Sequence, residues 1–146
     1  MLTIEAQIAE MSAVWPQFRL VGREGVMAAW RGRIRPLLQA YEVVIVYRAP
    51  IVGERVVTRV IQPRVYVQRP ALRPRINDAE GMLPHVYYEP DGAVFLCMLD
   101  PDADEWSAAD SLARTTVPWT IDWLAAYEGW RATGTWTASG RHVERA

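Results

Sequence analysis

The stretch "YEVVIVYRAP", from Tyr41 to Pro50, carries the clearest strand signal in the sequence. It is rich in β-branched and aromatic residues, which pack well on a pleated, half-buried surface. Before it, Phe18 to Val21 and Val26 to Ile34 are extended in character and separated by glycines, so they predict a hairpin. After it, Glu54 to Pro70 continues the extended character, with Pro63 as an interruption or an edge position. The middle of the chain therefore predicts consecutive antiparallel strands.

A helix is expected before these strands. Residues Thr3 to Val14 place Ile4, Ile8 and Met11 at near-helical spacing, and Pro16 stops the segment. The order of a helix, several strands, a long irregular stretch and a final helix is typical of an α+β fold with an antiparallel sheet. We expect residues 1–146 to form a single domain, because the chain is long enough for one core and shows no linker or repeat.

The final helix is predicted in "VPWTIDWLAAYEGWRATG". Pro118 suits a first helical position, and Gly134 is a natural helix stop. Large side chains form a broad stripe along one face: Trp119, Trp123, Leu124, Tyr127 and Trp130. Such a stripe is more often a buried core face than a groove for a partner protein, although aromatic residues are also enriched at interfaces.

A second, shorter hairpin is expected in "HVYYEPDGAVFLCMLD". Its arms are "HVYY" and Val94 to Leu99, and Pro90-Asp91-Gly92 forms the turn. The loop from Ala71 to Leu83 precedes it and is expected to frame a cleft. Cys97, the only cysteine in the chain, lies in the second arm.

Composition excludes several function classes. The net charge is −1 and basic residues form no block, so nucleic-acid binding through bulk electrostatics is not expected. No apolar run approaches the roughly 20 residues that span a bilayer, and the N-terminus lacks the basic region of a signal peptide. One cysteine cannot form an internal disulfide, which fits a reducing compartment. We therefore expect a cytoplasmic protein that binds neither nucleic acid nor membrane.

All 16 basic residues are arginines, and lysine is absent. A GC-rich genome is the simpler explanation, since its codons favour arginine. The other explanation is functional: a protein that handles reactive acyl groups benefits from having no side-chain amine that could accept them by accident. The two explanations are compatible.

Cys97 has apolar neighbours, and a free cysteine in such surroundings is more often inert core than a nucleophile. His85 could pair with it as a base, although a lone histidine is more often structural. The only other histidine is His142. One cysteine and two histidines fall short of a structural zinc set, and the acidic turns lack the spacing of a calcium loop. Nucleotide-binding loops are also absent from the sequence, so we expect no metal and no cofactor.

Several motifs occur together in the order that they have in ubiquitin-conjugating enzymes. They are Pro84-His85-Val86, Asp91-Gly92, Leu96-Cys97, and Trp106 followed by a helix. The chain most resembles a bacterial branch of that family through "PHVY", "LC", "EW", "SLARTTVPW", "WLAAYEGW" and "TGTW". That branch belongs to antiphage (CBASS) operons, which also encode a cGAS-like nucleotidyltransferase. The resemblance implies a ubiquitin-conjugating-enzyme fold: an N-terminal helix, an antiparallel β-meander, an irregular active-site stretch and a C-terminal helix.

The resemblance also implies a mechanism in which Cys97 is the nucleophile. Its thiolate would take up an activated polypeptide C-terminus as a thioester and pass it to an acceptor, without a cofactor at the site. His85 would organise the adjoining loop or act as a base, and backbone N–H groups or Tyr87 would stabilise the oxyanion. The carried polypeptide would be the C-terminal tail of the cGAS-like nucleotidyltransferase, primed for defence, or a ubiquitin-like protein. An activating enzyme would be a further partner.

Two features depart from the family pattern. Pro84 precedes His85 and no asparagine follows, whereas in the eukaryotic enzymes that asparagine is associated with oxyanion stabilisation during transfer to lysine. The interval from Gly92 to Cys97 is longer than usual, which indicates a longer hairpin or a bulge. The missing asparagine leaves open an inactive scaffold of the same fold that binds a partner protein. A Cys–His hydrolase is a further alternative, and it requires His85 within hydrogen-bond reach of the thiol.

Overall fold

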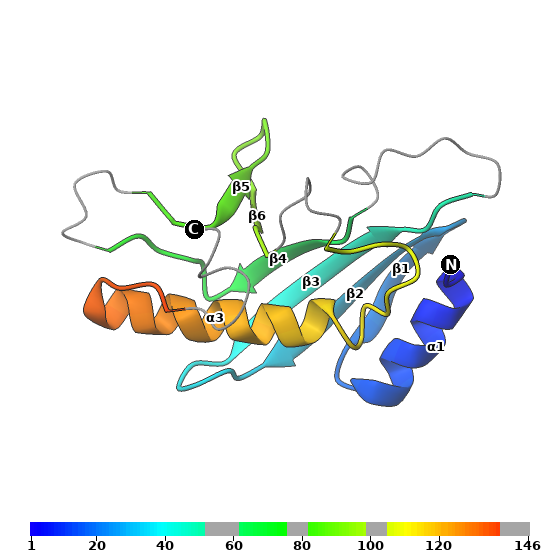
Figure 1. The fold of residues 1–146 in the computed structure, drawn as a ribbon, viewed down its shortest axis with the longest axis horizontal. Helices are drawn as coiled ribbons and strands as arrows, with labels where there is room; N and C mark the ends of the chain where they lie inside the picture. Colours follow the sequence, from blue (N-terminus) through cyan, green and yellow to red (C-terminus); the bar gives the residue numbers. More distant parts are fainter. Residues whose placement is uncertain (52–61, 76–81, 99–104, 138–146) are drawn as a thin grey trace.

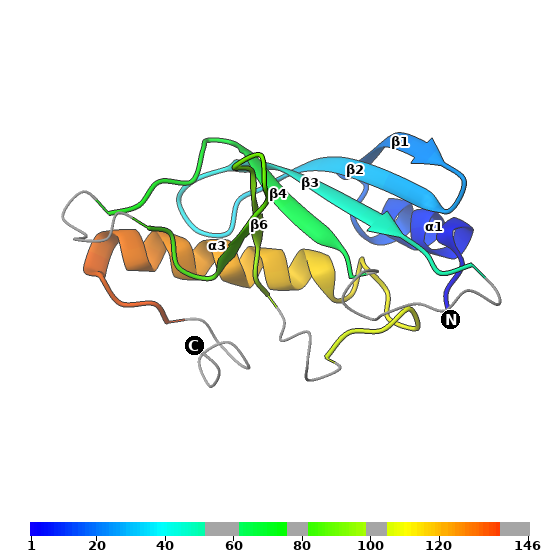
Figure 2. The same cartoon turned by 90° about the horizontal axis from the view of Figure 1, so that it is seen from above.

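The strand predicted at Tyr41 is an inner strand of a four-stranded antiparallel sheet. The computed structural model describes residues 1–51, 62–75, 82–98 and 105–137. The strands follow one another in the sheet in chain order: β1 (Arg19–Glu24), β2 (Met27–Ile34), β3 (Tyr41–Arg48) and β4 (Arg64–Arg69). Helix α1 (Ile4–Val14) and helix α3 (Thr116–Thr133) lie on the same side of this sheet (Figures 1 and 2). This arrangement confirms the predicted α+β fold.

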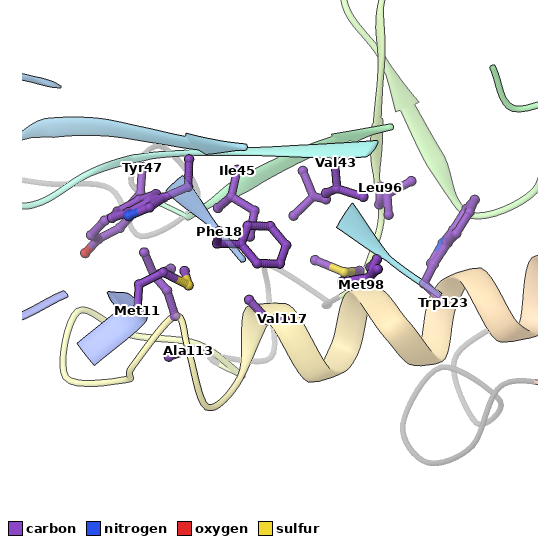
Figure 3. Close-up of a cluster of buried hydrophobic side chains, with 14 of the residues drawn as sticks. Met11, Phe18, Val43, Ile45, Tyr47, Leu96, Met98, Ala113, Val117 and Trp123 are labelled. Atoms are coloured by element: carbon purple, nitrogen blue, oxygen red, sulfur yellow. The ribbon is translucent and has the colours of Figure 1, made fainter. Parts of the chain in front are cut away.

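One face of the sheet is buried because apolar residues alternate along its strands. In β3, every second residue is buried, namely Tyr41, Val43, Ile45 and Tyr47. Side chains in a strand point alternately to opposite faces, so this pattern puts a single apolar row toward the helices. Figure 3 shows Val43, Ile45 and Tyr47 facing Met11 and Val117 across the core. Burial of these two layers against each other is the main stabilising contribution of the fold.

Helix α1 is tied to the segment that leads into α3 by a buried glutamine. The side-chain amide of Gln7 donates from Nε2 to the carbonyl of Asp110 at 2.8 Å, and its Oε1 accepts from the backbone N–H of Leu112 at 2.9 Å. Trp15 adds a third connection, because its Nε1 donates to the carbonyl of Ala113 at 2.6 Å. Thr3 caps the helix by accepting from the backbone N–H of residue 6. The irregular chain ahead of α3 is therefore held from the opposite end of the sequence.

Helix α3 buries most of the predicted aromatic stripe. Four of its five residues are buried, namely Trp123, Leu124, Tyr127 and Trp130, so the prediction that they belong to the core is confirmed. Trp119 is only half-buried. Gly134 ends the helix with a φ of 84°, as predicted. The position of Pro118 was predicted wrongly: it is the third helical residue and not the first. The third position accommodates proline because the first N–H groups of a helix have no intrahelical acceptor.

The remaining strand predictions differ from the structure mainly at their boundaries. The first hairpin is confirmed as β1 and β2, with a register shift between Leu20 and Gly22. Strand β4 begins directly after Pro63, which therefore marks the strand's start. The earlier part of that predicted segment, residues 54–61, lies outside the described residues, as does Leu99. Within the described residues, none of the helices combines the length and apolar character needed to cross a membrane.

Gly32 on β2 provides a stability prediction, because a Cβ atom at this position would lie 2.5 Å from Cγ of Phe18. Phe18 is 3% exposed, so its ring is packed on nearly all sides. We expect Gly32→Ala to lower the free energy of unfolding by about 1–3 kcal/mol, as overpacking of a core usually does. Urea denaturation measures the difference.

Gly129 is the matched control for this substitution. A Cβ atom there meets nothing within 4 Å, and the residue lies inside α3. We expect Gly129→Ala to raise stability by up to about 1 kcal/mol, since alanine is the better helix former. Equal changes in the free energy of unfolding for the two substitutions would contradict the prediction that a Cβ atom at Gly32 clashes with Phe18.

Candidate active site

The second predicted hairpin is present and consists of β5 (Val86–Tyr88) and β6 (Val94–Leu96), which pair without a register shift. The turn between them is closed by Glu89, whose N–H donates to the carbonyl of Ala93 at 2.7 Å. Gly92 has a φ of 90°, a conformation that favours glycine. The arm from Val94 to Leu96 is therefore regular, and the irregular position is the left-handed Gly92, where the turn has the hydrogen bonds of a bulged three-residue loop.

Aromatic contacts and an ion pair hold this hairpin against the main sheet. The Phe95 ring stacks on Tyr87 with centroids 5.2 Å apart, and it packs at 6.1 Å against Tyr66 of β4. The guanidinium of Arg64 lies 4.6 Å from the Phe95 centroid and forms a 2.9 Å ion pair with Glu89. The Tyr66 hydroxyl donates to the same carboxylate. Strand β4 therefore determines where the hairpin stands.

The hairpin brings His85 and Cys97 opposite each other. The backbone N–H of Cys97 donates to the carbonyl of His85 at 2.9 Å, one residue beyond the last strand pair. Trp123 of α3 donates from Nε1 to that same carbonyl at 3.0 Å. The two predicted site residues are thus adjacent across the chain, and the final helix anchors them. His142 lies outside the described residues.

The thiol-bearing residue sits between two core residues but is not itself part of the core. Leu96 and Met98 are only 5% and 4% exposed, whereas Cys97 is half-buried. Met98 lies under α3, where its sulfur accepts from the hydroxyl of Thr120 at 3.4 Å. Figure 3 shows Leu96 and Met98 in the layer between the sheet and α3. Because successive residues of an extended chain point to opposite sides, Cys97 faces away from this layer and retains accessible surface.

His85 has an unusual backbone conformation and a perturbed side chain. Its φ is 54°, in the left-handed region that residues other than glycine seldom adopt. Such conformations are concentrated at functional sites, where the surrounding structure enforces them. Burial lowers the pKa of the His85 imidazole below its ordinary value of 6.5. The ring is therefore neutral at neutral pH, the form that can accept a proton.

This lowered pKa predicts a pH-dependent stability. As the pH falls below about 6.5, the unfolded chain binds a proton at residue 85 before the folded chain does, so the folded state loses stability. The loss ends once the pH is below the folded-state pKa. Asparagine tolerates the left-handed conformation, so His85→Asn is the suitable variant. When the pH is lowered from about 8 to about 5, we expect its free energy of unfolding to fall less than that of the wild type. Urea titrations at several pH values measure it, and parallel curves would contradict it.

Tyr87, the predicted oxyanion residue, is on β5 with 40% of its surface exposed and its ring on Phe95. Trp123 and Trp136 also contact His85, and neither contact could be predicted from the sequence. In the sequence, Trp123 stood out only as part of the aromatic stripe and Trp136 only as part of the motif "TGTW". Within the described ranges, no three His, Cys, Asp or Glu side chains gather closely enough to hold a metal ion.

A comparison with protein families found a match over most of the chain. The family model for E2-CBASS, described as Type II CBASS E2 protein, matches residues 7–143. That range begins within α1 and includes α3, both described sheets, His85 and Cys97. A comparison with curated proteins found no match.

Proposed function

Because the chain belongs to the family of Type II CBASS E2 proteins, we propose that it carries a polypeptide C-terminus as a thioester on Cys97 and transfers it to an acceptor. Membership of this family implies an E2-like role in CBASS antiphage defence. The observation that supports the chemistry is the 2.9 Å backbone hydrogen bond between Cys97 and His85, which makes half-buried Cys97 a neighbour of that histidine. A nucleophile needs this combination of access to substrate and a titratable neighbour.

The proposed reaction has two steps. In the first, the Cys97 sulfur bonds to the carbonyl carbon of an activated C-terminal carboxyl group, the activating group leaves, and the thiol proton passes to a base. In the second, an acceptor nucleophile attacks the thioester carbonyl and Cys97 leaves as the thiolate. A thiolate is a good leaving group, so the thioester remains reactive toward an amine.

His85 is proposed to assist the first step. Its neutral imidazole is able to accept the thiol proton directly or through a water molecule. Its carbonyl also holds the Cys97 backbone in place. Both roles depend on the left-handed backbone conformation of His85, which orients its carbonyl and its side chain.

The proposed carried polypeptide is the C-terminal tail of a cGAS-like nucleotidyltransferase, and a ubiquitin-like protein is the alternative. An activating enzyme would supply the acyl donor in an ATP-dependent step. Residues 1–146 would act as a single domain in the cytoplasm.

The test is an in vitro conjugation. The chain is incubated with ATP, a CBASS activating enzyme and the cGAS-like nucleotidyltransferase, and the products are separated with and without reductant. We expect an adduct that reductant removes and that maps to the peptide containing Cys97. Reactions without ATP are the control.

The absence of lysine makes this result easy to interpret. Among these 146 residues, no lysine side chain is available to form an isopeptide bond. An adduct on this chain that resists reductant, or one on this chain that maps away from Cys97, would contradict the proposal. Binding of the synthase without any adduct would favour the scaffold alternative.

A further inference from the structure

The Trp136 side chain covers His85. Its ring centroid lies 4.7 Å from that of His85 and 5.0 Å from that of Trp123, and Trp130 is 6.3 Å away. Trp136 is half-buried, whereas Gly134, Thr135 and Thr137 beside it are exposed. Residues 134–137, here named the C-terminal strap, are therefore anchored by one side chain, and that side chain rests on the histidine.

The path of the C-terminal strap is set by hydrogen bonds at the end of α3. Gly134 reverses the chain with a φ of 84°, and its N–H donates to the carbonyl of Trp130 at 2.7 Å. Arg75 donates to the carbonyls of Trp130 and Arg131, both at 2.8 Å. The N–H of Thr135 then donates to the side chain of Thr133 at 3.1 Å. Figures 1 and 2 both show the chain turning back along the helix after this point.

His85 is consequently held on two sides by different parts of the molecule. Its carbonyl accepts from the N–H of Cys97 and from Nε1 of Trp123. Its ring packs against Trp136. A left-handed histidine persists only where its surroundings over-determine it. The backbone bonds hold the peptide, and the strap holds the imidazole.

We propose that Trp136 is a positioning residue, which keeps the His85 imidazole packed and oriented on the segment opposite Cys97. This inference rests on the proposed function of Cys97. Trp136 acts through His85 and takes no part in bond formation. The C-terminal strap thereby contributes to the active site from about fifty residues further along the chain than His85.

The experiment compares Trp136→Ala, Trp136→Leu and Trp136→Phe in a His142→Gln background, so that His85 is the one histidine that titrates. NMR of the imidazole C–H signals gives the pKa of His85 in each protein. We expect the alanine and leucine variants to raise this pKa toward 6.5, because the ring becomes hydrated. Phenylalanine, which preserves a ring over the imidazole, is expected to restore the wild-type value.

Thioester formation is measured on the same proteins over a range of pH. We expect Trp136→Ala to slow it by about tenfold or more near pH 7, within the range attributed to a positioned acid–base group, and to shift its pH profile with the new pKa. Trp136→Phe should recover most of the rate. Tyr88→Ala, which removes an aromatic residue that is 52% exposed on β5, is the matched control and should change neither readout.

The two readouts separate this inference from the proposed function. An unchanged His85 pKa in folded Trp136→Ala or Trp136→Leu would overturn the role of Trp136, even if the thioester forms normally. A shifted pKa with an unchanged rate and pH profile would also overturn it. No thioester on the wild type would disprove the proposed function, and the positioning role would fall with it. The leucine variant keeps an apolar anchor and provides the test if the alanine variant does not fold.

Discussion

Cys97→Ala is expected to eliminate the reductant-sensitive adduct completely. The substitution removes the only thiol in the chain, and no other side chain can form a thioester. Folding should be little affected, because Cys97 is half-buried and its backbone N–H still donates to His85. Electrophoresis without reductant measures the adduct, and urea denaturation establishes that the variant is folded.

Cys97→Ser distinguishes loss of the nucleophile from loss of the site. A serine hydroxyl occupies nearly the same volume and forms an oxyester, which thiol reductants do not cleave. We expect this variant to accumulate a small amount of reductant-resistant, alkali-sensitive adduct if His85 assists as a base. An adduct of wild-type amount and reductant sensitivity on Cys97→Ala would place the chemistry elsewhere.

Trp106→Ala is expected to have the largest effect on stability, a loss of about 3–5 kcal/mol in the free energy of unfolding. Trp106 is 1% exposed, and its ring meets Tyr47 of β3 edge-on with centroids 5.2 Å apart. Its Nε1 donates to the hydroxyl of Thr115, the N-cap residue of α3, at 3.0 Å. The substitution therefore leaves a large cavity between the sheet and the start of α3. Urea denaturation followed by fluorescence measures the loss.

Leu38→Ala is the control for removing a large apolar side chain. Leu38 is 84% exposed, so its truncation should change stability by no more than about 0.5 kcal/mol. A cost below about 1 kcal/mol for Trp106→Ala would show that this tryptophan is not a core residue in solution. Loss of adduct formation in a Trp106 variant would be attributed to unfolding and not to catalysis.

Much of the fold was predictable because local pattern and burial agree. Strand β3 reads as a strand from composition, and the same alternation puts its apolar row toward the helices. Gly134 ends α3 where the sequence predicted, since a left-handed helix cap favours glycine. Pro118 was misplaced because several positions in the first helical turn tolerate a residue without an N–H.

The candidate site was predictable only in part. Motif order identified Cys97 and His85, and their adjacency follows from the hairpin between them. The partial exposure of Cys97 could not be predicted from the sequence, because the apolar run "VFLCML" is typical of a fully buried strand. Only the packing of Leu96 and Met98 beneath β4 and α3 decides that the residue between them is turned outward.

By itself, the sequence determined the α+β order of elements, the alternation along β3 and the short hairpin. These properties depend on residues near one another in the chain, where steric preference and apolar periodicity act directly. The tertiary structure alone decided that Gln7 holds the approach to α3, that His85 adopts a left-handed backbone and that Trp136 covers its ring. These features depend on contacts between residues far apart in the sequence, and their separation along the chain does not predict how close they lie in space. Such contacts form only when burial of the core brings the ends of the chain against its middle.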